Sequence, residues 1–334
     1  ICLEVLSYVS MTADSEKCQY TSNPMFVDLD MEKKQKLCVD ISSIKYNHDL
    51  VRLHEPEQHL NTLNINSHGF RGEEFDLKKQ ENEYRIVVMG SSMILGLGAT
   101  SDNTTIPYIL EQQMENYGLE DVTVINAGII AANSASEIYM IDNILPKYEP
   151  DMIIVYEGYN DSWNIPIYDL DNSTNQATIQ RTSLENFVKN NFDYLNFPKM
   201  IYQKTHDYLA ILTIDNNMMK ENAELWKNRW DSTCETYDIP ILLLMQPIAG
   251  IGNKKLTDDE KYLLEDEKYN VITQTYSEIL NVSKKLNCEY VYDLTNIFDS
   301  YDERIYVTRA HLTDNGNYII AEKMFELSHT MIYN

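Results

Sequence analysis

The chain has 334 residues and an apolar fraction of 43%, which is enough to fill the core of one large domain or two modest ones. Its 27 lysines and arginines stand against 52 aspartates and glutamates, so the formal net charge is −25. Such a charge repels phosphate backbones and anionic lipid surfaces, and it therefore argues against nucleic acid as a partner.

The five cysteines show no CxxC spacing and predict neither a zinc knuckle nor a redox motif. Cys18 and Cys38 either form a small N-terminal disulfide or stay free. Cys234 and Cys288 come just before apolar runs, so we interpret them as packed thiols.

The N-terminal residues 1–84 lack strong periodicity and predict an irregular extension with short elements. From residue 85 to 334, short β-type runs alternate with amphipathic helical patterns, which predicts one α/β domain with a parallel sheet covered on both faces. The expected strands are 85–89, 122–126, 152–158, 240–247 and 289–294, and the expected helices are 105–118, 134–145, one ending near 234, 257–286 and 313–327. The alternation pauses at about 165–220, where we expect an insertion with two helices.

Residues suited to acyl transfer follow the predicted strands. Ser92 comes after the first strand, Ala131 after the second, Asn160 after the third, and His311 after the last. The carboxyl ends of strands in a doubly wound sheet lie at one edge, so these residues are expected to meet. A hydroxyl, a backbone amide, a side-chain amide and an imidazole are the groups that nucleophilic acyl transfer needs.

Four sequence blocks resemble the SGNH hydrolases, also called GDSL-type esterases, over residues 64–330. They are "GSSMILGLG", "NAGIIAANSASE", "GYND" and "HLTDNGNYIIAEKM", in the order in which that family has them. The resemblance implies a three-layer α/β/α, flavodoxin-like fold with a mostly parallel five-stranded sheet. It also implies Ser92 as nucleophile, His311 as general base, the Ala131 amide and the Asn160 side chain as oxyanion donors, and no cofactor.

The chain departs from the family pattern at two places that bear on chemistry. Ser91 stands where the first block has aspartate, and Thr308 stands where the last block has the aspartate that orients the histidine. Three hypotheses follow for His311: a dyad with Ser92 that Thr308 or a backbone carbonyl orients, a borrowed carboxylate from Asp302 or Glu303, or a catalytically feeble site. Loss of the triad carboxylate in a serine protease costs about 10⁴ in rate.

Each candidate also has a purely structural explanation. Ser92 could cap the following helix, Asn160 could be an ordinary turn residue, and His311 could lie on the surface. Arg71 could clamp an acidic substrate group or hold the N-terminal extension against the core. The "GSSMILGLGAT" stretch fits neither dinucleotide nor triphosphate loops, and the seven histidines show no metal-ligand spacing.

These observations predict a serine esterase or acyltransferase that acts on an ester-linked acyl group. By resemblance, a small molecule or an O-acetyl carbohydrate is the expected substrate. The alternative is an impaired relative that binds glycans or proteins. Sequons at Asn103, Asn172 and Asn281 fit an extracytoplasmic protein. The opening "ICLEVLSYVS" resembles the tail of a longer segment, so membrane association is expected only through an upstream anchor.

Overall fold

A five-stranded, fully parallel sheet forms the centre of the molecule in the computed structural model, which describes residues 29–47, 51–163, 214–265 and 267–332. The strand order is β4-β3-β5-β6-β7. The strands are β3 (Tyr84–Gly90), β4 (Val122–Gly128), β5 (Met152–Glu157), β6 (Ile241–Met245) and β7 (Tyr290–Asp293). This sheet confirms the predicted α/β fold class.

The strands form where continuous apolar runs can be buried on both faces. All six residues of β5 and all five of β6 are buried, as parallel strands covered by helices require. β7 lies at an edge and none of its residues is fully buried. The hydrophobic core thus lies along β3, β5 and β6, and its main cluster includes Val88, Ile154 and Leu243.

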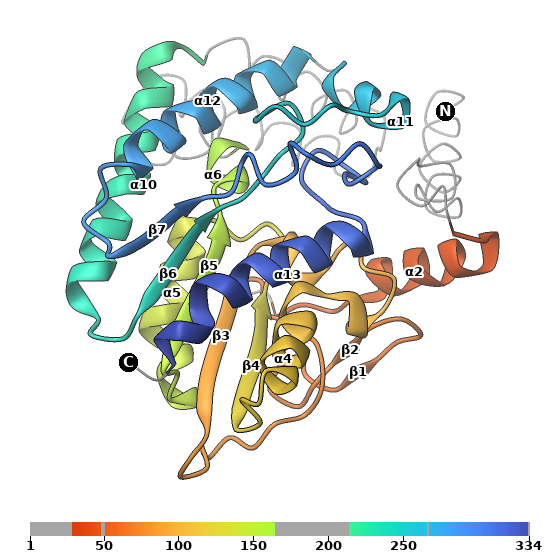
Figure 1. Cartoon of the computed structure of the whole chain (residues 1–334), viewed down its shortest axis with the longest axis vertical. Helices are drawn as coiled ribbons and strands as arrows, with labels where there is room; N and C mark the ends of the chain where they lie inside the picture. The colour runs from red at the N-terminus through yellow and green to blue at the C-terminus, as the bar shows by residue number, and fades with distance from the viewer. Residues whose placement is uncertain (1–28, 48–50, 164–213, 266, 333–334) are drawn as a thin grey trace, which may run out of the picture.

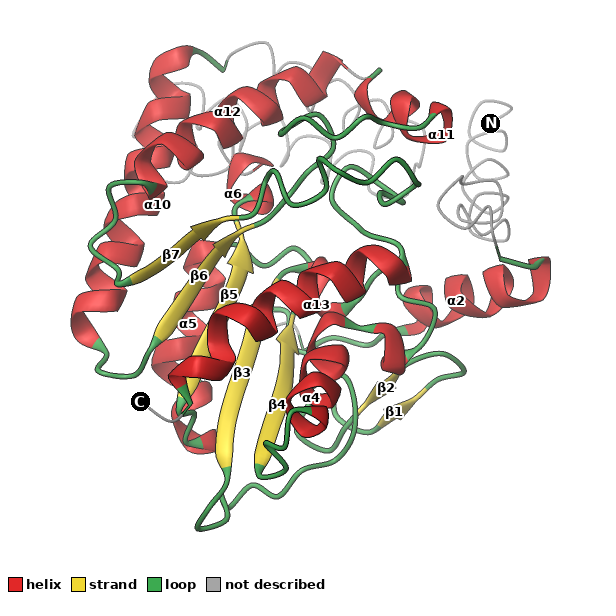
Figure 2. Cartoon of the chain, viewed as in Figure 1, coloured by secondary structure: helices red, strands yellow, loops and turns green. Residues whose placement is uncertain are grey.

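Helices cover both faces of the sheet, which gives three layers (Figures 1 and 2). On one face α4 (Ile106–Asn116) packs against α13 (Asp314–Ser328), and on the other α5 (Ser134–Asn143), α10 (Asn216–Thr236) and α12 (Glu267–Ser283) pack together. The short helices are α3 (Ser92–Leu95), α6 (Tyr159–Trp163) and α11 (Asp258–Lys261), and the 3₁₀ turns are Asp102–Thr104, Leu145–Tyr148, Tyr262–Leu264 and His329–Met331.

The described part of the N-terminal extension holds more regular structure than its sequence suggests. It contains the helix α2 (Met31–Ser43) and a small antiparallel pair, β1 (Gln58–His59) with β2 (Asn64–Ile65). Asp30 caps α2 by accepting a hydrogen bond from the backbone of Lys33 at 2.9 Å. Phe70 is buried in the same hydrophobic cluster as the central sheet, so the extension packs directly on the core.

The helix predicted over 257–286 is divided. Thr257 caps the short α11, a 3₁₀ turn follows, and α12 begins at residue 267. The division follows from burial of Glu260, whose carboxylate accepts the backbone N–H groups of Ile305 at 2.9 Å and Tyr306 at 2.8 Å. The two helices expected in the 165–220 insertion fall mainly on residues outside the described ranges.

The interpretation of Cys234 and Cys288 as free packed thiols is wrong. They form a disulfide with a Cα–Cα distance of 5.3 Å, which joins the end of α10 to the start of β7. The pairing was hidden because the two cysteines are 54 residues apart, and only the fold brings them together. Cys38 is also disulfide-bonded, but its expected partner Cys18 lies outside the described residues.

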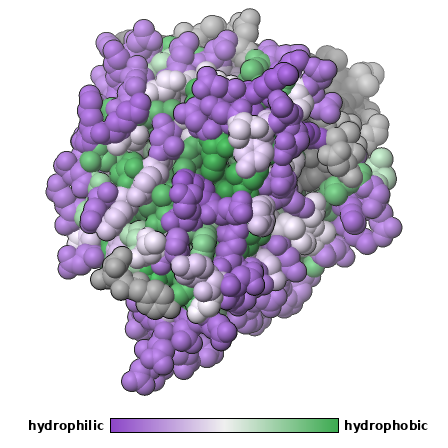
Figure 3. Space-filling model, in the orientation of Figure 1, coloured by the Kyte–Doolittle hydropathy of each residue, from purple (hydrophilic) through white to green (hydrophobic). Residues whose placement is uncertain are grey.

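The face of the molecule in Figure 3 is mainly hydrophilic, with hydrophobic residues showing between the polar ones. This agrees with a net charge of −25 carried by surface carboxylates. Among the described residues, none of the helices combines the length and the apolar character that crossing a membrane requires.

Candidate active site

Three of the predicted site residues lie at the carboxyl ends of neighbouring strands. β3 pairs with β4 on one side and with β5 on the other, and the chain leaves β3 for β4 and returns to β5. Ligands of doubly wound sheets bind where the strand order reverses in this way. Ser92, Ala131 and Asn160 follow these three strands in turn, so the fold brings them to that crevice.

Close backbone packing fixes the turn that carries Ser92. A Cβ on Gly90 would lie 2.5 Å from the carbonyl oxygen of Tyr156, and a Cβ on Gly128 would lie 2.0 Å from the amide nitrogen of Leu95. Glycine is therefore required at both positions, and it lets α3 sit directly against the ends of β4 and β5. Ser92 is the first residue of α3 and is 8% exposed.

The Ser92 hydroxyl faces an imidazole. Ser92 Oγ and His311 Nε2 are 2.8 Å apart, although 219 residues separate them in the chain. The N-cap position of α3 belongs to Ser91, so Ser92 does not serve as the helix cap that its sequence context allowed. This contact between a hydroxyl and an imidazole is the basic unit of a serine hydrolase site.

Thr308 lies at the other ring nitrogen of His311. Thr308 Oγ1 is 2.7 Å from His311 Nδ1 and also accepts the backbone N–H of His311 at 3.1 Å. The structure thus has a hydroxyl where a triad has a carboxylate. Neither Asp302 nor Glu303 takes that place, and the Glu303 carboxylate instead accepts a hydrogen bond from Asn315 at 3.2 Å.

A hydroxyl at Nδ1 has a consequence for the His311 tautomer. If Thr308 accepts from Nδ1–H, then Nε2 has a free lone pair and can take the proton of Ser92. If Thr308 donates to Nδ1, then Nε2 carries the proton and cannot act as a base. A hydroxyl allows both arrangements, whereas an ionised carboxylate allows only the first.

The charge state of His311 follows from its surroundings. Partial burial lowers the pKa of His311 to about 4, because it removes water from the charged imidazolium. The ring is therefore neutral at neutral pH and available as a base, but it is a weak one.

The other two candidates lie on segments that contact each other, Ala131 on the loop before α5 and Asn160 in α6. Ala131 has a φ of +60°, a left-handed conformation that costs a residue with a Cβ about 1 kcal/mol. Glycine adopts this conformation without that cost. Asn160 Nδ2 donates to the carbonyl of Ala132 at 2.7 Å, which leaves its second N–H for another acceptor. The backbone N–H of Ile129 donates to Gly90 at 3.0 Å and holds this loop beside the Ser92 turn.

Arg71 lies beneath the site and has structural partners. Its guanidinium is buried, pairs with Asp102 at 2.7 Å, and donates to the carbonyls of Leu95 and Gly96, each at 3.0 Å. These contacts support a structural role for Arg71, rather than that of a clamp for an acidic substrate group. It ties the N-terminal extension to the end of α3.

Comparison with known proteins was made at three levels. No protein-family model and no curated protein matches the sequence. The solved structures that it resembles are esterases and lipases. An acetyl xylan esterase is 17% identical with a TM-score of 0.43, and the alignment covers 73% of this chain and 99% of that one. The lipase/acylhydrolase from Enterococcus faecalis is 14% identical with a TM-score of 0.42, covering 73% and 94%.

A third similar structure is a protein from Desulfitobacterium hafniense DCB-2 assigned to the lipolytic G-D-S-L family. It is 14% identical with a TM-score of 0.39, and the alignment covers 73% of this chain and 99% of that one. At this level of identity, conclusions about chemistry depend on the site residues themselves.

A cluster of buried acids behind the site was not anticipated from the sequence. Glu137, Glu157 and Asp161 are each at most 3% exposed. The sequence signal that could have revealed the cluster is Glu157, which ends an otherwise buried, mainly apolar strand directly before Gly158. A carboxyl in that position must be buried, and a buried carboxyl needs a proton or a partner.

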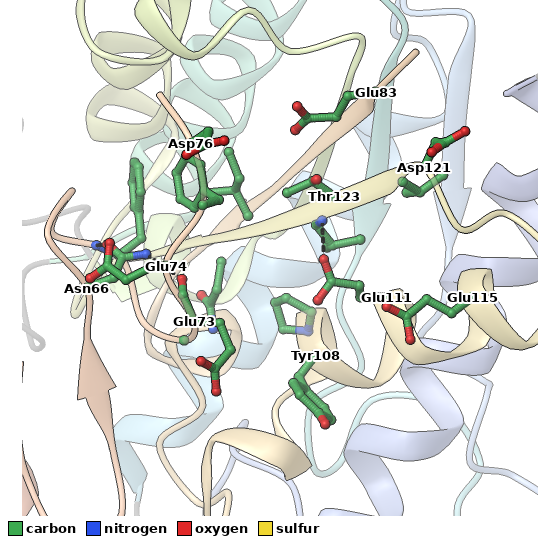
Figure 4. A pocket seen from close by; sticks show the side chains of 18 of the residues that line it. Asn66, Glu73, Glu74, Asp76, Glu83, Tyr108, Glu111, Glu115, Asp121 and Thr123 are labelled. Atoms are coloured by element: carbon green, nitrogen blue, oxygen red, sulfur yellow. Dashed lines mark hydrogen bonds between the residues drawn. The ribbon is translucent and has the colours of Figure 1, made fainter. Parts of the chain in front are cut away.

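A separate hollow of about 710 Å³ lies along the outer edge of β4 and does not include the candidate site. Figure 4 shows its acidic side chains, which come from the extension, from α4 and from the turn before β4; among those that it labels are Glu73, Glu83, Glu111, Glu115 and Asp121. In the part of the chain that the structure describes, no group of three His, Cys, Asp or Glu side chains could hold a metal ion.

Proposed function

We propose that this chain is an SGNH-type serine hydrolase that cleaves or transfers an ester-linked acyl group. The observation that carries the proposal is the 2.8 Å contact between Ser92 Oγ and His311 Nε2 at the topological switch point of a parallel sheet. The Ala131 loop and the Asn160 side chain support it, because Asn160 donates to Ala132 of that loop and Ile129 of the same loop donates to Gly90 beside the Ser92 turn.

In the proposed mechanism, Ser92 Oγ attacks the ester carbonyl carbon and His311 Nε2 takes the hydroxyl proton. The oxygen of the tetrahedral intermediate accepts hydrogen bonds from the backbone amides of Ser92 and Ala131 and from Asn160 Nδ2. When the carbon–oxygen ester bond breaks, His311 returns the proton to the leaving alcohol. The acyl-enzyme is then attacked either by water, which gives hydrolysis, or by the hydroxyl of an acceptor, which gives acyl transfer.

As the acyl substrate we propose an O-acetyl group on a carbohydrate, a choice supported by the resemblance to SGNH hydrolases. We further propose that the protein works outside the cytoplasm, attached to a membrane only if an upstream anchor is present. The disulfide between Cys234 and Cys288 supports this location, because disulfides persist in oxidising compartments.

One observation favours a second candidate function, that of a glycan- or protein-binding relative with an eroded site. Thr308 supplies no charge to stabilise an imidazolium, so the base is weak. The two candidates differ in one measurable property, which is turnover that depends on Ser92.

The test is hydrolysis of p-nitrophenyl acetate and of acetylated xylo-oligosaccharides by the parent chain and three variants. Ser92→Ala should abolish turnover, and Asn160→Ala should lower kcat by about 10²–10³, the usual cost of one oxyanion donor. Ser91→Ala is the matched control, since its hydroxyl contacts only the sulfur of Met93 among the described residues and should leave kcat within about threefold. Turnover that survives in Ser92→Ala would overturn the proposal, and a parent without turnover would support the binding function.

A further inference from the structure

The three buried acids come from three elements that surround the proposed oxyanion hole. Glu137 lies in the first turn of α5, Glu157 ends β5, and Asp161 lies in α6. Trp226 from α10 donates its indole N–H to Glu157 at 2.6 Å, and the carboxyl groups of Glu157 and Glu137 are hydrogen-bond neighbours. Three charges cannot be kept in so small a buried space.

The three carboxyl groups differ in the surroundings that shift their pKa values. Burial raises the pKa of Glu137 to about 8 and raises the pKa of Glu157 well above its ordinary value. Burial also raises the pKa of Asp161, but two hydrogen bonds from Ser134 and the charge of Arg229 oppose it. Asp161 is therefore the member whose hydrogen-bond donors best accommodate a negative charge, whereas burial favours the protonated forms of the two glutamates.

Asp161 and its neighbour Asn160 bind two nearby positions of one loop. Asn160 Nδ2 donates to the carbonyl of Ala132, and Asp161 accepts the backbone N–H of Ser134 at 3.0 Å and its hydroxyl at 2.5 Å. The loop that receives these contacts also carries Ala131 in its left-handed conformation. Asp161 thus connects the segment of one proposed oxyanion donor to the segment of the other.

Several further contacts hold the Asp161–Ser134 pair in place. Ser134 is the first residue of α5, where backbone N–H groups lack helical acceptors, so a carboxylate satisfies one of them and also meets the positive end of the helix. Ser134 is fully buried, and Arg229 donates to its hydroxyl at 3.2 Å. From the other side, Asn222 of α10 donates to the backbone carbonyl of Asp161 at 2.9 Å.

We propose that Asp161 is a positioning residue of the oxyanion hole, which sets the Ala131 amide and the Asn160 side chain at their working separation. This inference rests on the proposed esterase function. Asp161 contacts no reacting atom, and it acts through the loop that begins α5 and through the helix that carries Asn160.

The experiment is a double-mutant cycle on ester hydrolysis with Asp161→Asn, Asn160→Ala and the combined variant. Asp161→Asn keeps the size of the side chain but removes its charge, and it should lower kcat by about 10- to 100-fold with KM within about threefold, as small misplacements of catalytic groups do. Because Asp161 acts partly through Asn160 and partly through the Ala131 loop, the combined variant should lose clearly less activity than the product of the two single losses. Asp142→Asn, at the exposed far end of α5, is the control and should behave as the parent.

Losses that multiply in the combined variant, or an Asp161→Asn protein with the parent kcat, would overturn the inference while the esterase function stands. A parent without Ser92-dependent turnover would overturn both. If Asp161→Asn fails to fold by circular dichroism, Ser134→Ala replaces it in the same cycle. It removes the hydroxyl contact to Asp161 but keeps the backbone one, and should give a smaller loss of kcat that is again less than multiplicative beside Asn160→Ala.

Discussion

At the scale of single residues, Thr308 is what distinguishes this site from a serine triad. Its hydroxyl holds the His311 ring at 2.7 Å, so the ring is oriented, but it brings no charge to the imidazolium that forms when Ser92 loses its proton. Orientation without charge leaves His311 a neutral, weak base. In the proposed mechanism the serine and the histidine are in contact, but the imidazolium is less stabilised than in a triad.

Replacement of Thr308 by aspartate tests this description. His311 has a pKa of about 4 and stays neutral above that pH, so the parent's kcat/KM should fall only near pH 4. Thr308→Asp should raise the pKa of His311, move the acidic fall of kcat/KM to higher pH, and increase the plateau by up to about 10⁴. The measurement is a pH profile of ester hydrolysis from pH 3.5 to 9.

Thr308→Val is the control for the orienting hydroxyl. It removes the acceptor at Nδ1 while keeping the shape of the side chain, and should lower the plateau about tenfold, as for loss of one hydrogen bond. An aspartate variant whose profile and plateau equal those of the parent would show that position 308 has no influence on the base.

At the scale of elements, the outer edge of β4 is protected by a side chain. Glu111 of α4 accepts the backbone N–H of Val124 at 2.8 Å, and thereby occupies an edge group that could pair with another strand. Burial raises the pKa of Glu111 to about 7. The folded chain binds this proton more tightly than the unfolded chain does, so the group's contribution to stability is lost as pH rises from about 4.5 through 7.

Glu111→Gln should therefore stabilise the protein in a pH-dependent way. Glutamine still accepts from Val124 but has no charge to bury, so the free energy of unfolding should rise by about 1–2 kcal/mol at pH 8 and be unchanged near pH 4. Urea unfolding at the two pH values measures this. Glu115→Gln, one turn further along α4 and exposed, is the control, and an equal gain in both variants would contradict the account.

The disulfide between α10 and β7 is the second element-scale feature. It closes a loop of 54 residues, which the chain-entropy description values at about 4 kcal/mol. The double variant Cys234→Ala, Cys288→Ala should lose about 2–4 kcal/mol of unfolding free energy, measured by urea denaturation. Thiol-specific labelling of both cysteines in the folded parent, together with an unchanged stability of the variant, would contradict the pairing.

At the scale of the whole molecule, the sheet could be predicted because its strands are apolar runs that need no distant information. Ile153 and Leu243 lie in such runs and are buried. What the sequence could not show depends on distant contacts: the buried Glu260 that divides the predicted helix, and the cysteine pair across 54 residues. The same applies to the helix α2 and to the acid cluster behind the site.

The residues of the candidate site could be predicted from the sequence, but the hydrogen bonds between them could not. Strand ends placed Ser92, Asn160 and His311 at one edge of the sheet, and the structure brings the first and last of these to 2.8 Å. The sequence left open whether Thr308, Asp302 or Glu303 lies at the His311 ring, because those residues are close in sequence and only the loop conformation distinguishes them. The roles of all these residues in catalysis stay predictions.

The central claim is that Ser92 is an activated nucleophile, and the most direct test is reaction with a fluorophosphonate probe, followed by mass spectrometry of the labelled peptide. The account predicts one label on Ser92 in the parent and in Ser91→Ala, and none in Ser92→Ala. Labelling should weaken in His311→Ala, because the hydroxyl loses the base at 2.8 Å. A parent that stays unlabelled between pH 6 and 9, or a label that persists in Ser92→Ala, would contradict it.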